Sequence, residues 1–288
     1  MSIPSRREIL NDGSPFIERK NKMRDFSGIL PIMERAGQMV LSAHDVDAAI
    51  RVKPGDANFV TDYDVAVQDF LYEELGRLLP EAVVIAEESE ENHTELLASS
   101  LCLIIDPIDG TTNFIHNYRY SSISVGVCDR GRAVFGAVMN PYSRSIYHAE
   151  AGGGAFLFDT SSGTETGLSV SSRPLDMALV GFGTSPYYRD ELTEITFRAV
   201  EALFLRSRDV RRSGSAALDL SMTAAGSLDL FLEYRLSPWD VAAGSLLVTE
   251  AGGVITRIDG SPVTFDAPGS ILAGNPRAYE DALKAGIL

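Results

Sequence analysis

Apolar residues recur at helical spacing near the start of the chain. From Phe26 to Val40 they repeat at positions that fall on one helix face, which predicts an amphipathic helix. A second helix is expected to begin near Thr61 or Asp62, because another apolar stripe follows and Pro80 ends it. A turn at residues 53–56 would separate the two helices. The stripes consist of Phe26, Ile29, Leu30, Met33, Ala36, Gly37 and Val40, and of Val67, Phe70, Leu71, Leu75, Leu78 and Leu79.

The periodicity changes after Pro80 to short, continuous apolar runs. Residues 82–86 and residues 101–105 are typical of strands that are buried on both faces. Three longer strand-like segments with turn signals between them follow, at Ser122–Cys128, Ala133–Met139 and Ser145–Phe158. We therefore expect a sheet in this part of the chain.

Helices and strands alternate in blocks through the rest of the sequence. The pattern predicts strands at residues 178–183, 228–234, 254–258 and 271–273, and helices at residues 190–205, 216–225, 238–252 and 276–285. Because the elements alternate in blocks rather than singly, the pattern favours a layered α+β fold over a parallel Rossmann sheet.

A stretch rich in serine, threonine and glycine at residues 160–167 predicts a junction between two parts of the chain. The expected division is an N-terminal α+β part at residues 23–167 and a C-terminal α/β part at residues 168–288. Residues 1–22 are polar and aperiodic, which indicates a loose arm or an oligomer contact.

The chain is acidic, with a formal net charge of −15. This charge argues against a non-specific nucleic-acid binder, which needs a basic surface to displace counterions from phosphates. An acidic protein that binds a phosphate ester commonly offsets the repulsion with bound divalent cations. Surplus acid also aids solubility, so the charge alone leaves both interpretations open.

Other residue types indicate a protein of a reducing compartment. Cys102 and Cys128 lie in apolar runs, which predicts buried, reduced thiols rather than a disulfide. No apolar segment is long enough to span a bilayer, so a cytoplasmic protein without a membrane partner is expected. The histidines are scattered and no serine or cysteine nucleophile motif accompanies them, which argues against a catalytic triad.

The candidate chemistry lies in acidic residues at the ends of the predicted elements. Glu87 follows the first apolar run, Asp106 and Asp109 follow the second, and Asp240 opens a predicted helix. Carboxylates at strand ends and helix starts can converge on one cleft while rigid elements hold them.

The segment from Asp106 to Gly110 suits a hard cation. Pro107 keeps Asp106 extended, and Gly110 lets the chain turn, so both aspartates and the carbonyl of Ile108 can face one point. Such oxygen ligands are the ones that Mg²⁺ prefers, with waters and substrate phosphate completing the shell. The alternative is a loop with Asx-turns and a helix cap, which an isolated motif of this kind would more often be.

A phosphate cradle is expected if a helix begins after Gly110. The backbone amides of Gly110, Thr111 and Thr112 would then point toward a bound anion. Grouping several carboxylates in one place costs stability unless cations compensate their charges, which favours the metal interpretation over the structural loop.

Two long motifs resemble the signatures of the inositol monophosphatase family. Leu103–Phe114 (LIIDPIDGTTNF) matches the first signature and Trp239–Gly253 (WDVAAGSLLVTEAGG) matches the second. Glu87-Glu88 and the segment from Val60 to Asp64 fall in family order, and the resemblance extends from about Phe26 to the C-terminus. It implies a layered α/β/α/β/α sugar-phosphatase fold. It also implies Mg²⁺-dependent hydrolysis of a small phosphate monoester, with inositol monophosphate as the first candidate substrate.

The resemblance also implies ligands for two to three Mg²⁺ ions and the residues that bind substrate. Asp64 with Thr111 would orient or deprotonate the attacking water. The first ion would be held by Glu87, Asp106, the Ile108 carbonyl and Thr111, the second by Asp106, Asp109 and Asp240, and a third would share Glu87. Phosphate and substrate would contact Asp109, Gly110, Thr111, Thr112, Gly214, Ser215, Ala216, Glu233 and Asp240.

Alternatives within this fold are hydrolysis of fructose 1,6-bisphosphate, histidinol phosphate or adenosine 3',5'-bisphosphate. The segment His116–Tyr120 departs from the family pattern, which leaves the identity of the phosphorylated polyol open. Arg211-Arg212 could be a solvated pair or form the rim of the site or a dimer contact. From another class, the chain could be an accessory protein that binds a protein partner. The resemblance also implies a homodimer.

Overall fold

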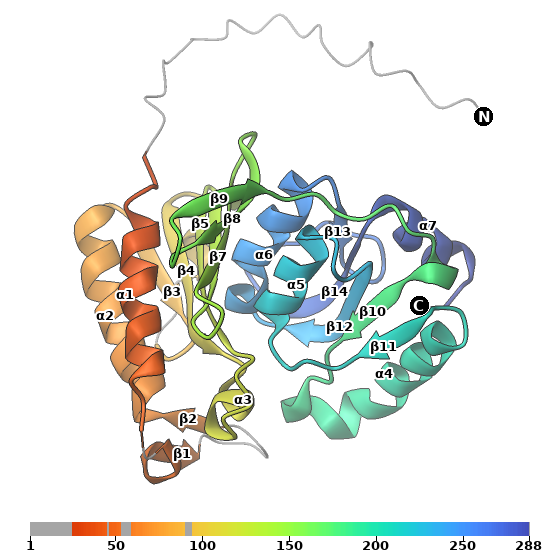
Figure 1. Ribbon diagram of the computed structural model, residues 1–288, viewed down its shortest axis with the longest axis horizontal. Helices are drawn as coiled ribbons and strands as arrows, with labels where there is room; N and C mark the ends of the chain where they lie inside the picture. Colours follow the sequence, from red (N-terminus) through yellow and green to blue (C-terminus); the bar gives the residue numbers. More distant parts are fainter. Residues whose placement is uncertain (1–24, 45, 53–58, 90–93, 288) are drawn as a thin grey trace, which may run out of the picture.

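The computed structural model describes residues 25–44, 46–52, 59–89 and 94–287. The expected N-terminal arm at residues 1–22 and the expected turn at residues 53–56 lie outside these residues. The described chain stacks in five layers, in which helices and sheets alternate (Figure 1). The α/β/α/β/α arrangement that the resemblance implies is thus confirmed.

Among the described residues, the first sheet contains seven strands in the order β3-β4-β5-β6-β7-β8-β9. Strands β3 and β4 are parallel, and every other neighbouring pair is antiparallel. The strands are β3 (Val83–Ala86), β4 (Leu101–Asp109), β5 (Ser122–Asp129), β6 (Arg132–Asn140), β7 (Ser145–Glu150), β8 (Gly154–Asp159) and β9 (Thr164–Gly167).

The first sheet is buried on both faces, which explains the continuous apolar run of β4. Leu103 and Ile105 face α1 (Ile29–Leu41) and α2 (Asp62–Leu78), while Cys102 and Ile104 face the opposite core. Successive side chains of a strand point to opposite faces, so a strand between two cores must be apolar at every position. Cys102 and Cys128 are both buried and free, as expected.

The middle layer consists of α5 (Ala216–Ala224) and α6 (Pro238–Glu250), which lie between the two sheets in Figure 1. Helix α6 approaches the first sheet so closely that β6 carries a glycine there. A Cβ added at Gly136 would lie 2.7 Å from the carbonyl oxygen of Ala243. This contact seats the start of α6, and with it Asp240, against the sheet that carries Asp106 and Asp109.

The second sheet has the strand order β11-β10-β12-β14-β13. Helices α4 (Arg189–Phe204) and α7 (Pro276–Lys284) cover its outer face, where a third core joins Val180, Leu232 and Leu272. Within the described residues, no helix is both long and apolar enough to cross a membrane. The strands are β10 (Leu179–Phe182), β11 (Asp209–Arg211), β12 (Leu230–Leu236), β13 (Val254–Thr256) and β14 (Gly269–Gly274).

Several short elements were not expected from the sequence pattern. They are too short to show a period: the hairpin β1 (Ile50–Val52) and β2 (Phe59–Thr61), the edge strand β11, and four 3-10 turns. The expected strand at Ser145–Phe158 is two strands, and residues 160–167 contain a turn and the edge strand β9. The turns are η1 (Val46–Ala49), η2 (Thr94–Leu96), η3 (Leu175–Met177) and η4 (Pro186–Tyr188).

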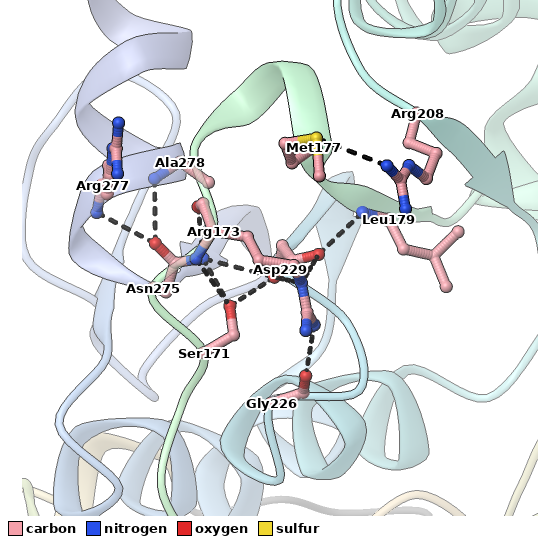
Figure 2. A network of polar contacts seen from close by, with 10 residues as sticks. All are labelled: Ser171, Arg173, Met177, Leu179, Arg208, Gly226, Asp229, Asn275, Arg277 and Ala278. Atoms are coloured by element: carbon pink, nitrogen blue, oxygen red, sulfur yellow. Dashed lines mark hydrogen bonds and ion pairs between the residues drawn. The ribbon is translucent and has the colours of Figure 1, made fainter.

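A buried carboxylate fastens the chain that leads into the second sheet (Figure 2). Asp229 is fully buried and accepts bonds from the backbone N–H of Leu179 at 2.7 Å and from Arg173 Nε at 2.9 Å. Ser171 Oγ also donates to this carboxylate. Asn275, which caps α7 through the N–H groups of Arg277 and Ala278, donates to Ser171 Oγ at 2.8 Å. One carboxylate thus links segments that are distant in sequence.

Asp229→Ala should lower the free energy of unfolding by about 2–4 kcal/mol, because it leaves buried donors without an acceptor. This loss of stability is smaller than for a fully buried ion pair because the Arg173 side chain is 45% exposed. Urea unfolding measures the change. Glu194→Ala breaks an exposed helical pair with Arg198 and should cost less than about 1 kcal/mol. Equal costs for the two variants would contradict the role of Asp229.

Candidate active site

Three carboxylates converge where β4 meets the start of α6. Oxygen atoms of Asp106, Asp109 and Asp240 all lie within 4.8 Å of one another. Glu87, directly after β3, lines the same cavity, which has a volume of about 350 Å³. Parallel pairing of β3 with β4 brings their ends to one edge of the sheet, so the four acids are neighbours although they are spread over the sequence.

Strand β4 continues to Asp109 rather than ending at Ile105 as expected. The ladder to β5 is interrupted between Asp106 and Asp109, where Pro107 has no N–H to donate. The backbone N–H of Ile108 instead donates to Asp106 Oδ1 at 3.0 Å. The irregularity allows both aspartates to line the cavity.

Asp109 is bound to the N-terminus of α5. Its carboxylate accepts from Ser215 Oγ at 2.5 Å, from the N–H of Ala217 at 2.9 Å and from the N–H of Ala216 at 3.3 Å. Ser122 Oγ of β5 donates to the same carboxylate at 3.3 Å. These bonds tie Gly214–Ala216 to the acidic cluster, so the expected substrate-contacting segment lies beside the expected metal ligands.

Asp240 occupies the third position of α6 and caps the start of its own helix. The backbone N–H of Ser237 donates to Asp240 Oδ2 at 2.6 Å. This bond leaves the other oxygen of the carboxylate available to the cavity. The neighbouring Trp239 lines the cavity and packs against the central core.

Burial and mutual repulsion raise the pKa values of the clustered acids. Burial is the largest cause for Asp106, and the charges of Glu87, Asp109 and Asp240 raise its pKa further. Burial and then Asp109 and Glu87 raise the pKa of Asp240 well above its usual value. Burial also raises the pKa of Asp109, although the hydrogen bonds from α5 and Ser122 oppose this shift. The ionised cluster is therefore unfavourable unless a cation compensates it.

Asp64 and Thr111 form a hydrogen-bonded pair beside the acids. Thr111 Oγ1 lies 3.3 Å from Asp64 Oδ1 and 3.2 Å from the Ile108 carbonyl oxygen. The other oxygen of Asp64 accepts from Thr61 Oγ1 at 2.5 Å and from the Thr61 N–H at 2.7 Å. Asp64 is fully buried and does not line the cavity, whereas its partner Thr111 does. Burial raises the pKa of Asp64 to about 6.

A helix begins directly after Gly110, as the expected phosphate cradle requires. Gly110 adopts a left-handed conformation, with φ of 89°, and α3 (Thr111–Ile115) begins directly after it. A Cβ at Gly110 would lie 2.9 Å from the Gly214 carbonyl oxygen, so only glycine fits this close approach. Gly110, Thr111 and Thr112 all line the cavity.

Glu233 lines the cavity, but its carboxylate also holds a loop. Glu233 Oε1 accepts from the N–H of Ser185 at 2.8 Å and from Ser185 Oγ at 3.0 Å. A Cβ at Gly183 would lie 1.8 Å from Glu233 Oε2, so the loop backbone packs directly on the carboxylate. Burial raises the pKa of Glu233 to about 7.

The loop at residues 183–188 is the part of the site that the sequence did not indicate. It lines the cavity and presents Tyr187, whose pKa is raised by burial and then by the charges of Glu87, Asp240, Asp106 and Asp109. Tyr187 is 44% exposed and lines the cavity that holds the acidic cluster. Arg212, Arg235 and Asp219 also line the cavity. Of these three residues, the sequence indicated only Arg212. It left open whether the Arg211-Arg212 pair is solvated, forms the rim of the site or makes a dimer contact.

The comparisons with known proteins agree with the fold. The model of the inositol monophosphatase family matches residues 28–286, so the chain belongs to this family. It is 32% identical over 250 residues to the inositol-1-monophosphatase of Bacillus subtilis, covering 86% of this chain and 91% of that protein. It is 34% identical over 250 residues to the Nus factor SuhB of Escherichia coli, covering 86% and 90%. The crystal structure of the extragenic suppressor protein SuhB from Bartonella henselae has a TM-score of 0.80 at 30% identity, covering 89% of this chain and 96% of that one.

The metal-free protein should lose stability as pH rises from about 5 to about 7.5. Glu233 ionises near its usual pKa of 4.5 in the unfolded chain but near 7 in the folded one, so the folded state binds more protons between these values. Asp219, whose pKa burial raises to about 7, acts in the same direction.

Thermal melts in EDTA across this pH range measure the effect. Glu233→Gln keeps an oxygen that can accept from Ser185 and should flatten the fall in melting temperature. The exposed Glu194→Gln should leave the fall unchanged. A melting temperature that rises with pH in the absence of metal would contradict this assignment of the buried acids.

Proposed function

We propose that this protein is a Mg²⁺-dependent phosphatase that hydrolyses a phosphate monoester of a small polyol, with inositol monophosphate as the first candidate. The observation that carries the proposal is the convergence of Asp106, Asp109 and Asp240 beside the helix start at Gly110–Thr112. Membership of the inositol monophosphatase family supports phosphatase chemistry. The same cavity would accommodate cations and phosphate together.

The donor set fits Mg²⁺. Carboxylates and a backbone carbonyl are hard oxygen ligands, and carboxylates whose protons are held tightly in the absence of a cation are suited to a divalent ion. In this proposal Glu87, Asp106, the Ile108 carbonyl and Thr111 would hold the first ion. Asp106, Asp109 and Asp240 would hold the second. When bound, the ions would lower the pKa of water and stabilise charge on the phosphate and the leaving oxygen.

The Asp64–Thr111 pair is proposed to orient the attacking water. Because Thr111 Oγ1 donates to Asp64, the lone pairs of its oxygen are available to accept a hydrogen bond from water. Asp64, with its pKa of about 6, is mostly ionised at neutral pH and can hold the proton that the water gives up. Water attacks phosphorus, the ester P–O bond breaks, and the products are the alcohol and inorganic phosphate. No covalent phosphoenzyme is expected.

Similarity to the Nus factor SuhB of Escherichia coli raises a second candidate function, that of an accessory protein that binds a partner. A protein that served only as an accessory to another machine would have no need of several buried carboxylates and an Asp64–Thr111 pair. Their joint presence here favours an enzyme. A homodimer in the cytoplasm remains a proposal that rests on the family resemblance.

Asp106→Asn should lower kcat/KM for myo-inositol 1-phosphate by about 100-fold or more, roughly 3 kcal/mol of transition-state stabilisation. The variant removes the charge that both proposed main ions share. Phosphate release over a series of Mg²⁺ concentrations measures the loss. Asp259→Asn, in an exposed turn outside the cavity, is the matched control and should retain activity. If Asp106→Asn turned over like wild type, the cluster would be structural.

A further inference from the structure

Asp219 is a carboxylate of the cavity to which the proposed Mg²⁺ chemistry gives no role. It belongs to α5, lines the cavity and is only 3% exposed. Burial is the largest cause that raises its pKa to about 7, and the charge of Asp109 acts in the same direction. Because a buried carboxylate beside another acid costs free energy of folding, the bonds that Asp219 makes call for a physical account.

Two hydroxyl groups from distant segments converge on this carboxylate. Ser213 Oγ donates to Asp219 Oδ1 at 2.5 Å and also bonds to Oδ2. Tyr120 Oη donates to the same Oδ1 at 3.3 Å. Tyr120 ends the segment His116–Tyr120, which departs from the family pattern, and Ser213 directly precedes Gly214–Ala216. Asp219 therefore joins these two segments.

Asn113 holds the same two segments from the side of the phosphate cradle. It is the third residue of α3, the helix that begins after Gly110, and it is buried. Its Nδ2 donates to the backbone carbonyl of Tyr120 at 2.7 Å and to that of Ser213 at 2.8 Å, which uses both N–H groups of the amide. Each segment is thus held twice, by its carbonyl at Asn113 and by its hydroxyl at Asp219.

The segments held in this way pack directly on the cradle. A Cβ at Gly110 would lie 2.9 Å from the carbonyl oxygen of Gly214 and 3.3 Å from that of Tyr120. A shift of either carbonyl would therefore change the backbone position of Gly110, and with it the N–H groups that are proposed to receive phosphate. The bonds to Asp219 restrain such a shift.

We propose that Asp219 is a positioning residue that, through Ser213 and Tyr120, holds the cradle at Gly110–Thr112 in the form that binds the substrate phosphate. The inference rests on the proposed function, which places the phosphate at this cradle. Because the cradle binds phosphate both before and during the reaction, its distortion should weaken the two states alike, so KM rises while kcat changes little. A proton donor to the leaving group would show the opposite pattern.

Ser213→Ala removes the shorter of the two bonds to Asp219. It should raise both the Kd of inorganic phosphate and the KM for myo-inositol 1-phosphate by about tenfold, because a small displacement of a binding group costs this much. Calorimetric titration with phosphate at saturating Mg²⁺ measures the first constant, and phosphate release measures the second. Tyr120→Phe removes the longer bond and should have a smaller effect of the same kind.

Ser171→Ala is the matched control. It removes a bond of the same type, from a serine hydroxyl to the buried Asp229, at a place outside the cavity. It should leave the Kd of phosphate and the KM unchanged at a temperature where the protein is folded. A role of Ser213 in stability alone would make the two serine variants behave alike and would overturn the proposal.

A double variant tests whether Ser213 acts through Asp219. In an Asp219→Ala background, Ser213→Ala should cause no further rise in the Kd of phosphate, because the serine has already lost its partner. A further rise of about tenfold would overturn the positioning role. If Asp219→Ala does not fold, Ser213→Ala and Tyr120→Phe still decide, because each leaves the carboxylate one hydroxyl partner.

The two proposals fail in different ways. Unchanged phosphate binding in both single variants, or a fall in kcat at unchanged KM, would overturn the role of Asp219 and leave the phosphatase proposal intact. A wild-type protein that binds no phosphate would overturn the cradle and the role of Asp219 with it. Absence of phosphate release from every ester, with phosphate binding weakened in the variants as described, would refute the phosphatase activity alone.

Discussion

The repulsion among the clustered carboxylates is the constraint on which the rest of this structure depends. Asp106, Asp109 and Asp240 have oxygens within 4.8 Å of one another, and burial with mutual repulsion raises the pKa of Asp106 and Asp240 well above the usual value. Such a cluster destabilises the fold unless cations bind it. The structure keeps it together because each acid belongs to a rigid element that large cores hold in place.

The N-termini of two helices offset part of this repulsion. Asp109 accepts N–H bonds from the first turn of α5, and Asp240 caps the first turn of α6. The positive end of a helix dipole stabilises a nearby carboxylate, so both aspartates sit where their charge is partly compensated. Close packing of α6 on Gly136 places the second of these helix starts against β4. Core packing and site electrostatics therefore depend on the same contact.

The sequence allowed the acidic half of the site to be predicted. Strong apolar runs located β3 and β4, and Glu87, Asp106 and Asp109 follow from their position at the ends of those runs. Asp64 could be assigned only through the family resemblance, because its partner Thr111 is distant in sequence and the residue is buried within α2.

The opposite wall of the cavity could not be predicted. It depends on the left-handed conformation of Ser185, with φ of 42°, and on the contact of Gly183 with Glu233. These interactions join segments far apart in the chain, and no local pattern of apolar or charged residues marks them. For the same reason the sequence left three alternatives open for Arg211 and Arg212, while the structure directs the first to Asp209 and the second to the cavity.

The most direct test of the account is the number of protons released when Mg²⁺ binds. If the clustered carboxylates hold protons in the metal-free protein, a cation must displace them, because its ligands are the ionised forms. Calorimetric titration with Mg²⁺ near neutral pH, in buffers of different ionisation enthalpy, measures that number. We predict that Mg²⁺ binds with release of about one proton or more. In Asp106→Asn, both the binding and the proton release should be lost. Binding without proton release, or no binding, would contradict it.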